Sequence, residues 1–429
     1  GTRAWDMMHC LCASVTPTDT FAPFLGDYLS RCASGSNSSP TAHRQLVQKA
    51  FAAHKRCVKG GARRHAPSQD DFRALRADLK LSTQIFFLDD TFEELPHDLL
   101  TTVGDATPSL ALAIKLKEYK TFGLFEVKRK LQVGMGIQSE DDDESQNNGE
   151  SSIALKDDQY LSDVLMDHKR LTTGGVSSSE SSQNDTSTPD ATSVKLVFQK
   201  RMFREGDELI TEPVFVSLSY LQVKHDFLTG KYPVNFDDAI KLAAFQIQAE
   251  DGGKLGQKES LNVLASQLKR FIPESILRQK GVDVWAMEVR NRHSLLVHDT
   301  TEDSKLGVLK MVRALPYGGA LFFSVKKIED PIGLLPGKIV LGVNKRGVHF
   351  FRPTPMEYLH SAELRDIMQF GSSHNAVFFK MRVAGVLHVF QFETNDGEQV
   401  CVNLQTHIND VMTKRYSEKK AKKEEKRNG

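Results

Sequence analysis

The sequence predicts a multidomain α+β protein, with a helical segment, a mixed lobe, a second helical lobe and a strand-rich lobe in that order. Three observations support this class. The chain has 429 residues, more than one ordinary hydrophobic core serves. The spacing of its apolar residues changes from helical to strand-like and back. Two polar segments, residues 138–152 and 172–193, hold too few apolar residues to form a core.

Composition excludes several other classes of protein. The formal net charge is only +1, so the charge of the whole chain indicates no partner. Five scattered cysteines, an odd number, predict free thiols in a reducing compartment. No apolar run approaches the roughly twenty residues that cross a bilayer. The chain begins without Met or a signal-peptide pattern, so we expect an excised fragment.

The first 78 residues are predicted to be helical. One stripe at helical spacing consists of Trp5, Met8, Leu11 and Cys12. A second helix runs from about Ala42 to Val58, and we expect its inner face to be Leu46, Val47, Ala50, Phe51 and His54. A third helix begins at Ser68, which forms an S-x-x-D capping pattern with Asp71.

Residues 80–204 follow a strand, turn, strand, helix, strand order. The predicted helix is capped by Thr102 and Asp105 and reaches Leu116. Gly104 and Pro108 are expected to loosen or bend its first turn. The predicted strands are Leu81–Leu88, Thr91–Leu100 after an Asp89-Asp90 turn, Phe122–Val127 and Val194–Phe198, with a short ordered return at Tyr160–Met166.

The two polar segments are predicted to be disordered insertions in this lobe. Five acidic residues stand in a row at Glu140–Glu144, and the second segment is rich in Ser, Thr and Asn. An acidic linker explains them, and so does a loop regulated by phosphorylation.

Residues 205–316 are predicted to be helical. Tyr220–Gly252 indicates two helices joined by a turn around Gly230 and Pro233. Asn235 is a suitable N-cap, followed by Asp237 and Asp238 in the first turn, where acidic residues favour the helix dipole. The first helix presents Leu218, Leu221, His225 and Leu228, and later helices are expected at Leu261–Phe271, Ile276–Arg290 and Leu306–Leu315.

Residues 317–416 are predicted to be mainly strands with one closing helix. Phe378 and Phe390 are expected to face the core, and the helix to begin near Gln405. The predicted strands are Leu321–Val325, Lys338–Val343, Val348–Arg352, Asn375–Arg382, Val386–Phe392 and Gln399–Leu404. Residues 417–429 are a charged helical extension without apolar a and d positions; a junction to a coiled coil is compatible with them.

Several sequence segments resemble segments of known protein families. The wording YLQVKHDFLTGKYP…DDAIKLAAFQIQAEDG resembles the central lobe of FERM domains. AWDMMHCLCASVTPT, FLGDYL and a long basic helix ending VKGGAR resemble the later part of a myosin tail homology 4 domain. LDDTFEELPHDLLTTV and ALPYGGALFFSVKKIEDPIGLLPGKIVLGVNKRGVHFFRP are similar to tails of the calmodulin-binding kinesin-14 family of plants and green algae.

This resemblance implies a partial helical bundle followed by a three-lobed FERM region. The implied lobes are ubiquitin-like at 80–204, helical and acyl-CoA-binding-protein-like at 205–316, and pleckstrin- or PTB-like at 317–416. It implies a non-catalytic tail of a minus-end-directed motor in the cytoplasm, bound to the cytoskeleton. The motor and the calmodulin-binding helix of that family lie outside this chain.

A basic run is the first candidate site. No acidic residue occurs between Tyr28 and Gln69, and the resemblance implies binding to acidic microtubules, with actin filaments as a second candidate. The predicted microtubule residues are Arg44, Lys49, Lys55, Arg56, Lys59, Arg63 and Arg64. A solvated face, or an acidic partner within the molecule, also explains the run. Nucleic acid is not expected, because no aromatic residues interleave the basic ones.

The last lobe suggests two further sites. The resemblance implies a groove that takes a peptide as an added strand, lined by Ala376, Val377, Phe378, Phe379, Lys380, His407, Val411 and Met412; plain core is the alternative. A membrane or receptor adaptor is the alternative function, with Lys326, Lys327, Lys345 and Arg346 holding a phosphoinositide head group.

Catalytic signals are weak. Cys10 and Cys12 point to different helix faces, and the histidines nearby lack metal-ligand spacing. Residues 252–258 lack the GxxxxGK[ST] pattern and follow a helix. No catalytic residue, metal or cofactor is predicted, and an accessory region of a kinase or phosphatase would require a catalytic domain that this chain does not hold.

Overall fold

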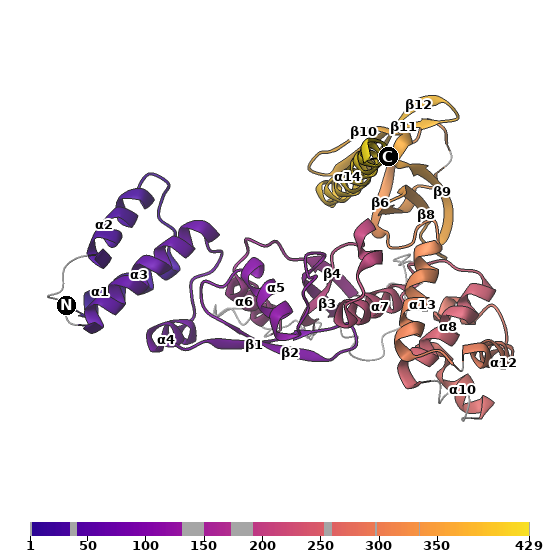
Figure 1. Ribbon diagram of the computed structural model, residues 1–429. Helices are drawn as coiled ribbons and strands as arrows, with labels where there is room; N and C mark the ends of the chain where they lie inside the picture. The colour runs from indigo at the N-terminus through magenta and orange to yellow at the C-terminus, as the bar shows by residue number, and fades with distance from the viewer. Residues whose placement is uncertain are drawn as a thin grey trace, which may run out of the picture. The chain divides into compact units, whose positions relative to one another are not determined.

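The computed structural model describes residues 2–34, 41–130, 150–172, 192–252, 260–296, 298–333 and 335–428 (Figure 1). The chain divides into two compact units, and the boundary lies between Gln199 and Lys200. We call them the N-terminal unit and the C-terminal unit and describe each by itself. The mixture of helical bundle, small sheet, helical lobe and seven-stranded sheet confirms the predicted multidomain α+β class.

The N-terminal unit begins with four helices: α1 (Thr2–Ser14), α2 (Ala22–Ser34), α3 (Thr41–Gly60) and α4 (Gln69–Ala77). Helix α3 packs against α1 and α2. Val47, Ala50 and His54 of its predicted inner face are buried. The predicted cap of α4 is confirmed, because Ser68 and Asp71 form a reciprocal capping box.

Two features of this bundle differ from the prediction. Helix α2 was not predicted as a helix, although its sequence is amphipathic. In α1, Leu11 is 51% exposed, and His9 is buried instead. The α1 stripe is therefore rotated toward His9, Cys12 and Ala13, which face α3.

The rest of the N-terminal unit is a five-stranded sheet in the order β2-β1-β5-β3-β4 with two helices. The strands are β1 (Leu81–Phe86), β2 (Phe92–His97), β3 (Phe122–Lys130), β4 (Glu150–Ala154) and β5 (Thr192–Lys200), and the helices are α5 (Val103–Ala113) and α6 (Leu161–Thr172). Thr102 and Asp105 cap α5 as predicted. The expected loosening of its first turn is not seen, because Gly104 N–H donates to the Asp157 carbonyl and the capping box closes the turn.

The predicted insertions begin and end differently from the expectation. Residues 150–152 belong to β4, which pairs with β3, and residues 192 and 193 belong to β5. The predicted short return at Tyr160–Met166 is the first half of α6. The remaining parts of both insertions, residues 138–149 and 173–191, lie outside the described residues.

The C-terminal unit opens with a helical lobe. Its segments are η1 (Glu205–Leu209), α7 (Pro213–Leu228), α8 (Phe236–Asp251), α10 (Leu261–Gln267), η2 (Leu268–Arg270), α11 (Glu274–Leu277), α12 (Val282–His293), η3 (Ser294–Leu296) and α13 (Thr301–Ala314). The predicted hairpin is confirmed: Asn235 caps α8, and Gly252 ends it in the left-handed conformation at φ 57°. Trp285 and Ala243 lie in the fully buried centre of the lobe.

Three details of the helical lobe were predicted wrongly. The predicted face of α7 is only partly buried, and its core residues include Phe215, Tyr220 and Phe227, because the helix packs on more than one side. The expected single helix at Ile276–Arg290 is broken into α11 and α12, with Gly281 as N-cap. Helix α13 begins five residues earlier than predicted, at the capping box of Thr300 and Asp303.

The last lobe is a seven-stranded antiparallel sheet in the order β10-β11-β12-β6-β7-β8-β9. Its strands are β6 (Leu321–Glu329), β7 (Lys338–Asn344), β8 (Gly347–Arg352), β9 (Glu357–Glu363), β10 (Ile367–Ser372), β11 (Ala376–Val383) and β12 (Val386–Glu393), with η4 (Leu364–Asp366) between β9 and β10. A Cβ on Gly347 would lie 1.9 Å from the Ala362 carbonyl oxygen, so only glycine fits there. Helix α14 (Gly397–Asn428) lies beside β10 (Figure 1).

The last lobe corrects the prediction at three places. Strands β9 and β10 were not predicted. Residues 399–404, predicted as a strand, form the first turns of α14, which begins eight residues before the expected start. Phe390 faces the core, but Phe378 does not: Phe379 is the residue opposite Phe390, so the predicted register of β11 was shifted by one.

Among the described helices, none combines the length and the apolar composition that crossing a membrane requires.

Candidate interaction surfaces

One face of α3 is the part of the basic run that is open to solvent. Arg44, Lys55 and Lys59 fall within about 60° of one another at the 100° per residue of an α-helix, opposite the buried residues. Lys55 and Lys59 are exposed, and Arg44 is half-buried. Among the described residues, none of the three forms an ion pair with an acid, and the Lys55 ammonium lies 4.1 Å from the centre of the Phe51 ring. We call these three residues the α3 cationic face.

Two other predicted residues on α3 have acidic partners. The Arg56 guanidinium donates two hydrogen bonds to Asp98, at 2.8 and 2.9 Å. The hydrogen bonds to Asp98 raise the pKa of Arg56, although burial acts to lower it. Burial acts to raise the pKa of Asp98, but the hydrogen bonds from Arg56 hold that pKa below its usual value. Lys49 pairs with Asp78 at 3.1 Å. Both acids follow the basic run in sequence, so the expectation of an uncompensated surface was wrong for these positions.

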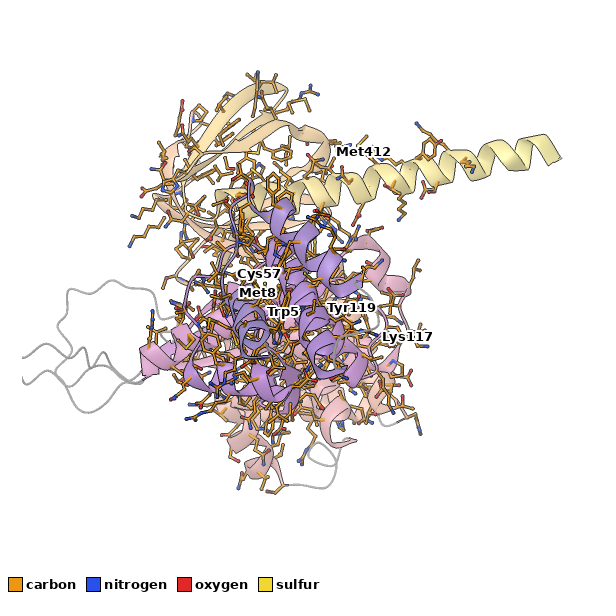
Figure 2. All side chains as sticks on the ribbon, turned by 90° about the vertical axis from the view of Figure 1, so that its left-hand side faces the viewer. Trp5, Met8, Cys57, Lys117, Tyr119 and Met412 are labelled. Carbon is orange, nitrogen blue, oxygen red and sulfur yellow. The ribbon has the colours of Figure 1, made fainter. Side chains whose placement is uncertain are left out.

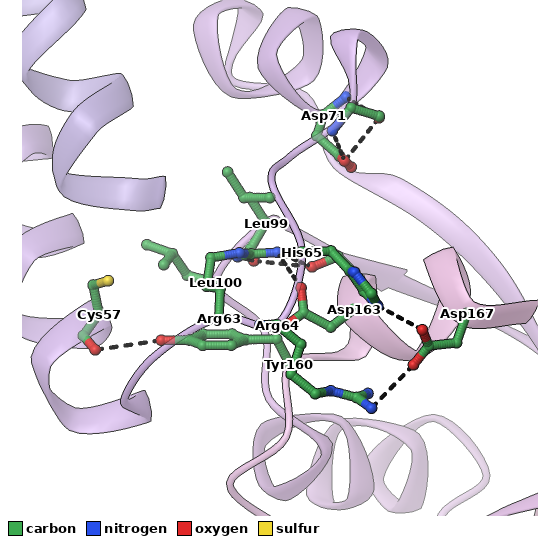
Figure 3. A network of polar contacts seen from close by, with 12 residues as sticks. Cys57, Arg63, Arg64, His65, Asp71, Leu99, Leu100, Tyr160, Asp163 and Asp167 are labelled. Atoms are coloured by element: carbon green, nitrogen blue, oxygen red, sulfur yellow. Dashed lines mark hydrogen bonds and ion pairs between the residues drawn. The ribbon is translucent and has the colours of Figure 1, made fainter. Parts of the chain in front are cut away.

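Arg63 is not a surface residue. Its side chain is 4% exposed and pairs with the equally buried Asp163 at 3.0 Å. It also donates to the Leu99 carbonyl and to Ser162 Oγ, at 2.6 Å each, and stacks on the Tyr160 ring. Figure 3 shows Arg63 between Leu99, Asp163 and Tyr160. Arg63 therefore joins the segment after α3 to helix α6, and it cannot reach a partner molecule.

The residues after Arg63 make further contacts with α6. Arg64 N–H donates to Asp163 at 2.7 Å, and its guanidinium pairs with Asp167 at 3.0 Å. The His65 ring meets the same Asp167 carboxylate at 2.5 Å (Figure 3). Arg64 thus joins Lys49, Arg56 and Arg63 as a predicted microtubule residue that the structure places in an internal ion pair.

The predicted peptide groove needs correction. Strand β11, which holds Ala376 to Lys380, pairs with β10 on one side and β12 on the other, so it is not a sheet edge. Val377 and Phe379 are fully buried in the core. The two edge strands of this sheet are β10 and β9, and α14 lies beside β10. A peptide that adds a strand next to α14 would therefore pair with Ile367–Ser372.

The helix side of the predicted groove divides in the same way. His407 is 1% exposed, and burial lowers its pKa to about 4, so it belongs to the core. Val411 is half-buried, and Met412 is 64% exposed. Figure 2 shows Met412 on α14, where the helix extends past the sheet.

The four predicted phosphoinositide residues do not converge. Because β6 pairs antiparallel with β7, Lys326 and Lys327 lie at one end of the strand pair, whereas Lys345 and Arg346 lie in the β7–β8 turn at the other. Lys326 faces Glu393 at 3.9 Å, and Lys327 donates to the Leu335 carbonyl. One head group cannot contact all four.

Ion pairs connect α14 to η1 in the C-terminal unit. Arg204 donates to Asp410 through Nε and Nη2. Lys345 pairs with Glu205 at 2.8 Å and with Glu208 at 2.5 Å, and Lys414 pairs with Glu205 at 2.6 Å. The two lysines hold the pKa of Glu205 below its usual range. We call these contacts the α14 clasp. Sequence analysis missed it because its partners are far apart in the sequence; Arg204 and Asp410, for example, are separated by 206 residues.

A second buried ion pair lies next to the clasp. Lys200 Nζ donates to Asp207 at 2.7 Å, and the two side chains are 1% and 4% exposed. The ammonium lies over the rings of Phe203 and Phe215. Burial lowers the pKa of Lys200 to about 8, although Asp207 opposes the shift.

Within the described ranges, no three His, Cys, Asp or Glu side chains gather as metal ligands. The chain's described cysteines are free thiols.

Family profiles match most of the chain. A MyTH4 domain matches residues 1–74, a FERM central domain residues 205–323, and a PTB domain of the IRS-1 type residues 323–412.

Two plant proteins match nearly the whole chain. A "Kinesin-like protein KIN-14I" of Oryza sativa subsp. japonica is 47% identical over 415 residues, and a "Kinesin-like protein KIN-14E" of Arabidopsis thaliana is 44% identical over the same length. These alignments cover 97% of this chain but 32% and 31% of those proteins. The chain thus spans about a third of the length of these relatives.

Solved structures show the same fold at low identity. The C-terminal MyTH4-FERM domain of human myosin 7b, in complex with a harmonin-a PDZ3 domain, has a TM-score of 0.62 at 18% identity, covering 96% of this chain and 75% of that one. A MyTH4-FERM MF1 domain of Dictyostelium discoideum myosin VII has a TM-score of 0.66 at 16% identity, covering 97% and 75%. The chain therefore combines a MyTH4 region with a three-lobed FERM region, and nearly all of it matches one segment of plant kinesin-14 proteins.

Proposed function

We propose that this chain is a tail module that attaches a motor protein to microtubules through the α3 cationic face. The observation that carries the proposal is the position of Arg44, Lys55 and Lys59 on one face of α3, without acidic partners among the described residues. The similarity of this chain to a segment of kinesin-like proteins also supports the proposal. The module binds and positions; it needs no catalytic residue.

The physical reason is electrostatic complementarity. A microtubule surface is strongly acidic, and clustered cations on a rigid helix speed association with it and orient the complex. The contribution of Arg56 and Lys49 is reduced, because Asp98 and Asp78 already neutralise them. The contact should weaken with salt, since the Debye length falls from about 10 Å at 0.1 M to about 3 Å at 1 M.

Microtubule co-sedimentation of the triple variant Arg44→Glu/Lys55→Glu/Lys59→Glu tests the proposal. Binding should fall at least tenfold while the thermal unfolding midpoint stays near that of the parent, because the two lysines are exposed. A matched control reverses two exposed lysines of α14, Lys419 and Lys420, and should bind as the parent does. Equal binding by the triple variant and the parent would remove the site from α3. Co-sedimentation of the same proteins with actin filaments tests the second candidate partner.

A second function is favoured by the free edge of β10. We infer that an extended peptide adds a strand there and that Met412 and the half-buried Ile408 of α14 contact its side chains. This edge shares no residue with the α3 cationic face, which belongs to the other unit. Met412→Asp should then weaken binding of a selected peptide without changing microtubule binding; a peptide bound equally by both forms would contradict the groove.

A further inference from the structure

One face of α12 in the helical lobe is apolar and open to solvent. The helix packs against α8 and α10 (Figure 1), and it buries Trp285 and Val289 on that side. Val284 and Met287 point the opposite way at the 100° per residue of an α-helix, and they are 41% and 49% exposed. The outer side of this helix therefore carries apolar side chains that stay accessible in the described part of the chain.

The apolar face continues beyond the end of α12. Asn291 lies within about 60° of Val284 and Met287 around the helix, and Leu295 of η3, which follows α12 directly, is 70% exposed. Steps of three or four residues separate these positions, as they do along the contact line of paired helices, where one asparagine among apolar residues fixes the register. We call Val284, Met287, Asn291 and Leu295 the α12 seam.

The flanks of the α12 seam carry charges of both signs. On one flank, Glu288 precedes Arg292 by one helical turn, and no ion pair joins either of them to another described residue. The other flank holds Asp283 and Arg290, again one acid followed by one base. Because the flanks have no net charge, a strongly charged partner such as an anionic membrane is not their electrostatic complement.

We propose that the α12 seam binds the same seam of a second copy of this chain, with the two α12 helices antiparallel. Around a two-fold axis, a contact of one residue with another is repeated with the two copies exchanged. Glu288 then faces Arg292 of the second copy, and Arg292 faces Glu288 of the second copy. Each unpaired charge thus gains an opposite charge twice per dimer.

The apolar residues require the same register as the charges. An axis midway between positions 288 and 292 lies within one residue of the midpoint of 284 and 295, and also of the midpoint of 287 and 291. Val284 therefore meets Leu295 of the second copy, and Met287 meets Asn291 of the second copy. A parallel pair would instead bring Glu288 level with its own copy, and like charges repel.

The dimer is weak because the contact is small. Helix α12 has 12 residues, a length of about 18 Å, so the pair buries less than the roughly 1,200–2,000 Å² of stable complexes. Arg290 also lies near the axis and faces its own copy, which opposes association. We expect a dissociation constant in the micromolar range. Such a dimer presents two copies of every other surface of the chain, which raises avidity for a repetitive partner.

Sedimentation velocity of the whole chain over a series of micromolar concentrations tests the seam. The parent should show a monomer–dimer equilibrium, and Met287→Asp should weaken it at least tenfold, because the seam would then bury a carboxylate. The matched control is Leu209→Asp, at an apolar residue of η1 that is 84% exposed, which should change the equilibrium less than twofold. A parent that stays monomeric, or a dimer that Met287→Asp leaves unchanged, would overturn the proposal.

A charge exchange tests the antiparallel arrangement. Glu288→Arg and Arg292→Glu should each weaken self-association at least tenfold, since each alone creates two like-charge contacts per dimer. An equal mixture of the two variants should associate as tightly as the parent within about threefold, because every facing pair again has opposite signs. A mixture that remains monomeric would contradict the antiparallel pair.

The double variant Glu288→Arg/Arg292→Glu guards against effects on folding. Both side chains are partly exposed, so the thermal unfolding midpoint should stay near that of the parent. The double variant restores opposite charges within one chain and should self-associate as the parent does. Loss of its self-association at an unchanged unfolding midpoint would count against the facing pairs.

Discussion

Among the described residues, Arg63–Asp163 in the N-terminal unit and Lys200–Asp207 in the C-terminal unit are buried ion pairs, and the two are built differently. In the N-terminal unit, the Arg63 guanidinium spreads its donors over Asp163, Ser162 and the Leu99 carbonyl. In the C-terminal unit, the Lys200 ammonium has Asp207 as partner and is surrounded by the rings of Phe203 and Phe215. The guanidinium of the first pair lies among polar acceptors, whereas the ammonium of the second lies over two aromatic rings.

The difference shows how the chemistry of the cation decides the environment it tolerates. Arginine cannot release its proton in a protein, so burying it requires acceptors for its donors. Lysine can deprotonate, and its pKa falls when it is buried. The Arg63 pair should therefore act as a fixed structural connection, and the Lys200 pair as one whose stability depends on pH.

Removing Arg63 should have the largest effect on stability. Arg63→Ala leaves the Asp163 carboxylate buried without its partner, which costs roughly 3–5 kcal/mol. Trp5 lies in the N-terminal unit and Trp285 in the C-terminal unit. In a Trp285→Phe background, tryptophan fluorescence during urea unfolding therefore reports on the N-terminal unit.

The neighbouring Arg64 is the matched control for Arg63. Its side chain is 50% exposed, so Arg64→Ala should cost less than about 1 kcal/mol. Equal costs at both positions would mean that the burial of Arg63 is not what makes it important.

Raising the pH should stabilise the C-terminal unit through Lys200. The pKa is about 8 in the folded state and 10.5 as a model value. Between these values the unfolded state binds more protons, so the free energy of unfolding rises with pH, by about 1.5 kcal/mol from pH 8 to 9.5. Trp285 fluorescence in urea series at several pH values measures this rise.

Other groups titrate in the same range, so the comparison must be with a variant. Burial raises the pKa of the Cys401 thiol, which opposes the rise as pH increases. The difference between the parent and a form without the Lys200 pair isolates the contribution of Lys200. A difference that does not change with pH would show that Lys200 is neutral or solvated throughout.

Replacing both members of the Lys200 pair should be milder than removing Arg63. Lys200→Met/Asp207→Asn removes both charges and keeps similar volumes, and such replacements of buried pairs are often neutral. We expect a change within about 1 kcal/mol at pH 7. A loss as large as that of Arg63→Ala would contradict the contrast between the two pairs.

The smallest effect is expected at the exposed pair of Arg56 and Asp98. The two side chains are 43% and 32% exposed, so Arg56→Ala should cost about 0.2–1 kcal/mol. Urea unfolding of the N-terminal unit measures it. A cost near that of Arg63→Ala would mean that hydrogen-bond geometry matters more than burial.

Local signals in the sequence predicted helix starts well. Ser68, Thr102 and Asn235 were identified as N-caps, and each accepts the expected backbone hydrogen bond. These predictions succeeded because a cap and its partner lie three residues apart. The family strings extended the prediction to the order of the lobes, which the comparisons confirm.

Contacts between distant residues were not predictable. Arg63 and Asp163 are 100 residues apart, so the basic run contained no sign that Arg63 is buried. In β11, apolar residues occupy adjacent positions, and alternation could not decide between Phe378 and Phe379. Residues 399–404 include two valines and a cysteine, which favour a strand locally, but α14 packing overrides that preference.

Helix α14 fixes the rotation about its own axis of any segment attached to its far end, relative to the last lobe. It is continuous from Gly397 to Asn428, and its first part is anchored in the core by Val400 and Leu404. Each residue of an α-helix advances about 1.5 Å and turns by about 100°. Whatever is joined to its far end therefore has a rotational setting counted in residues from the lobe. One residue inserted after Lys420 would turn that attachment by more than a quarter of a circle while moving it less than the width of an atom.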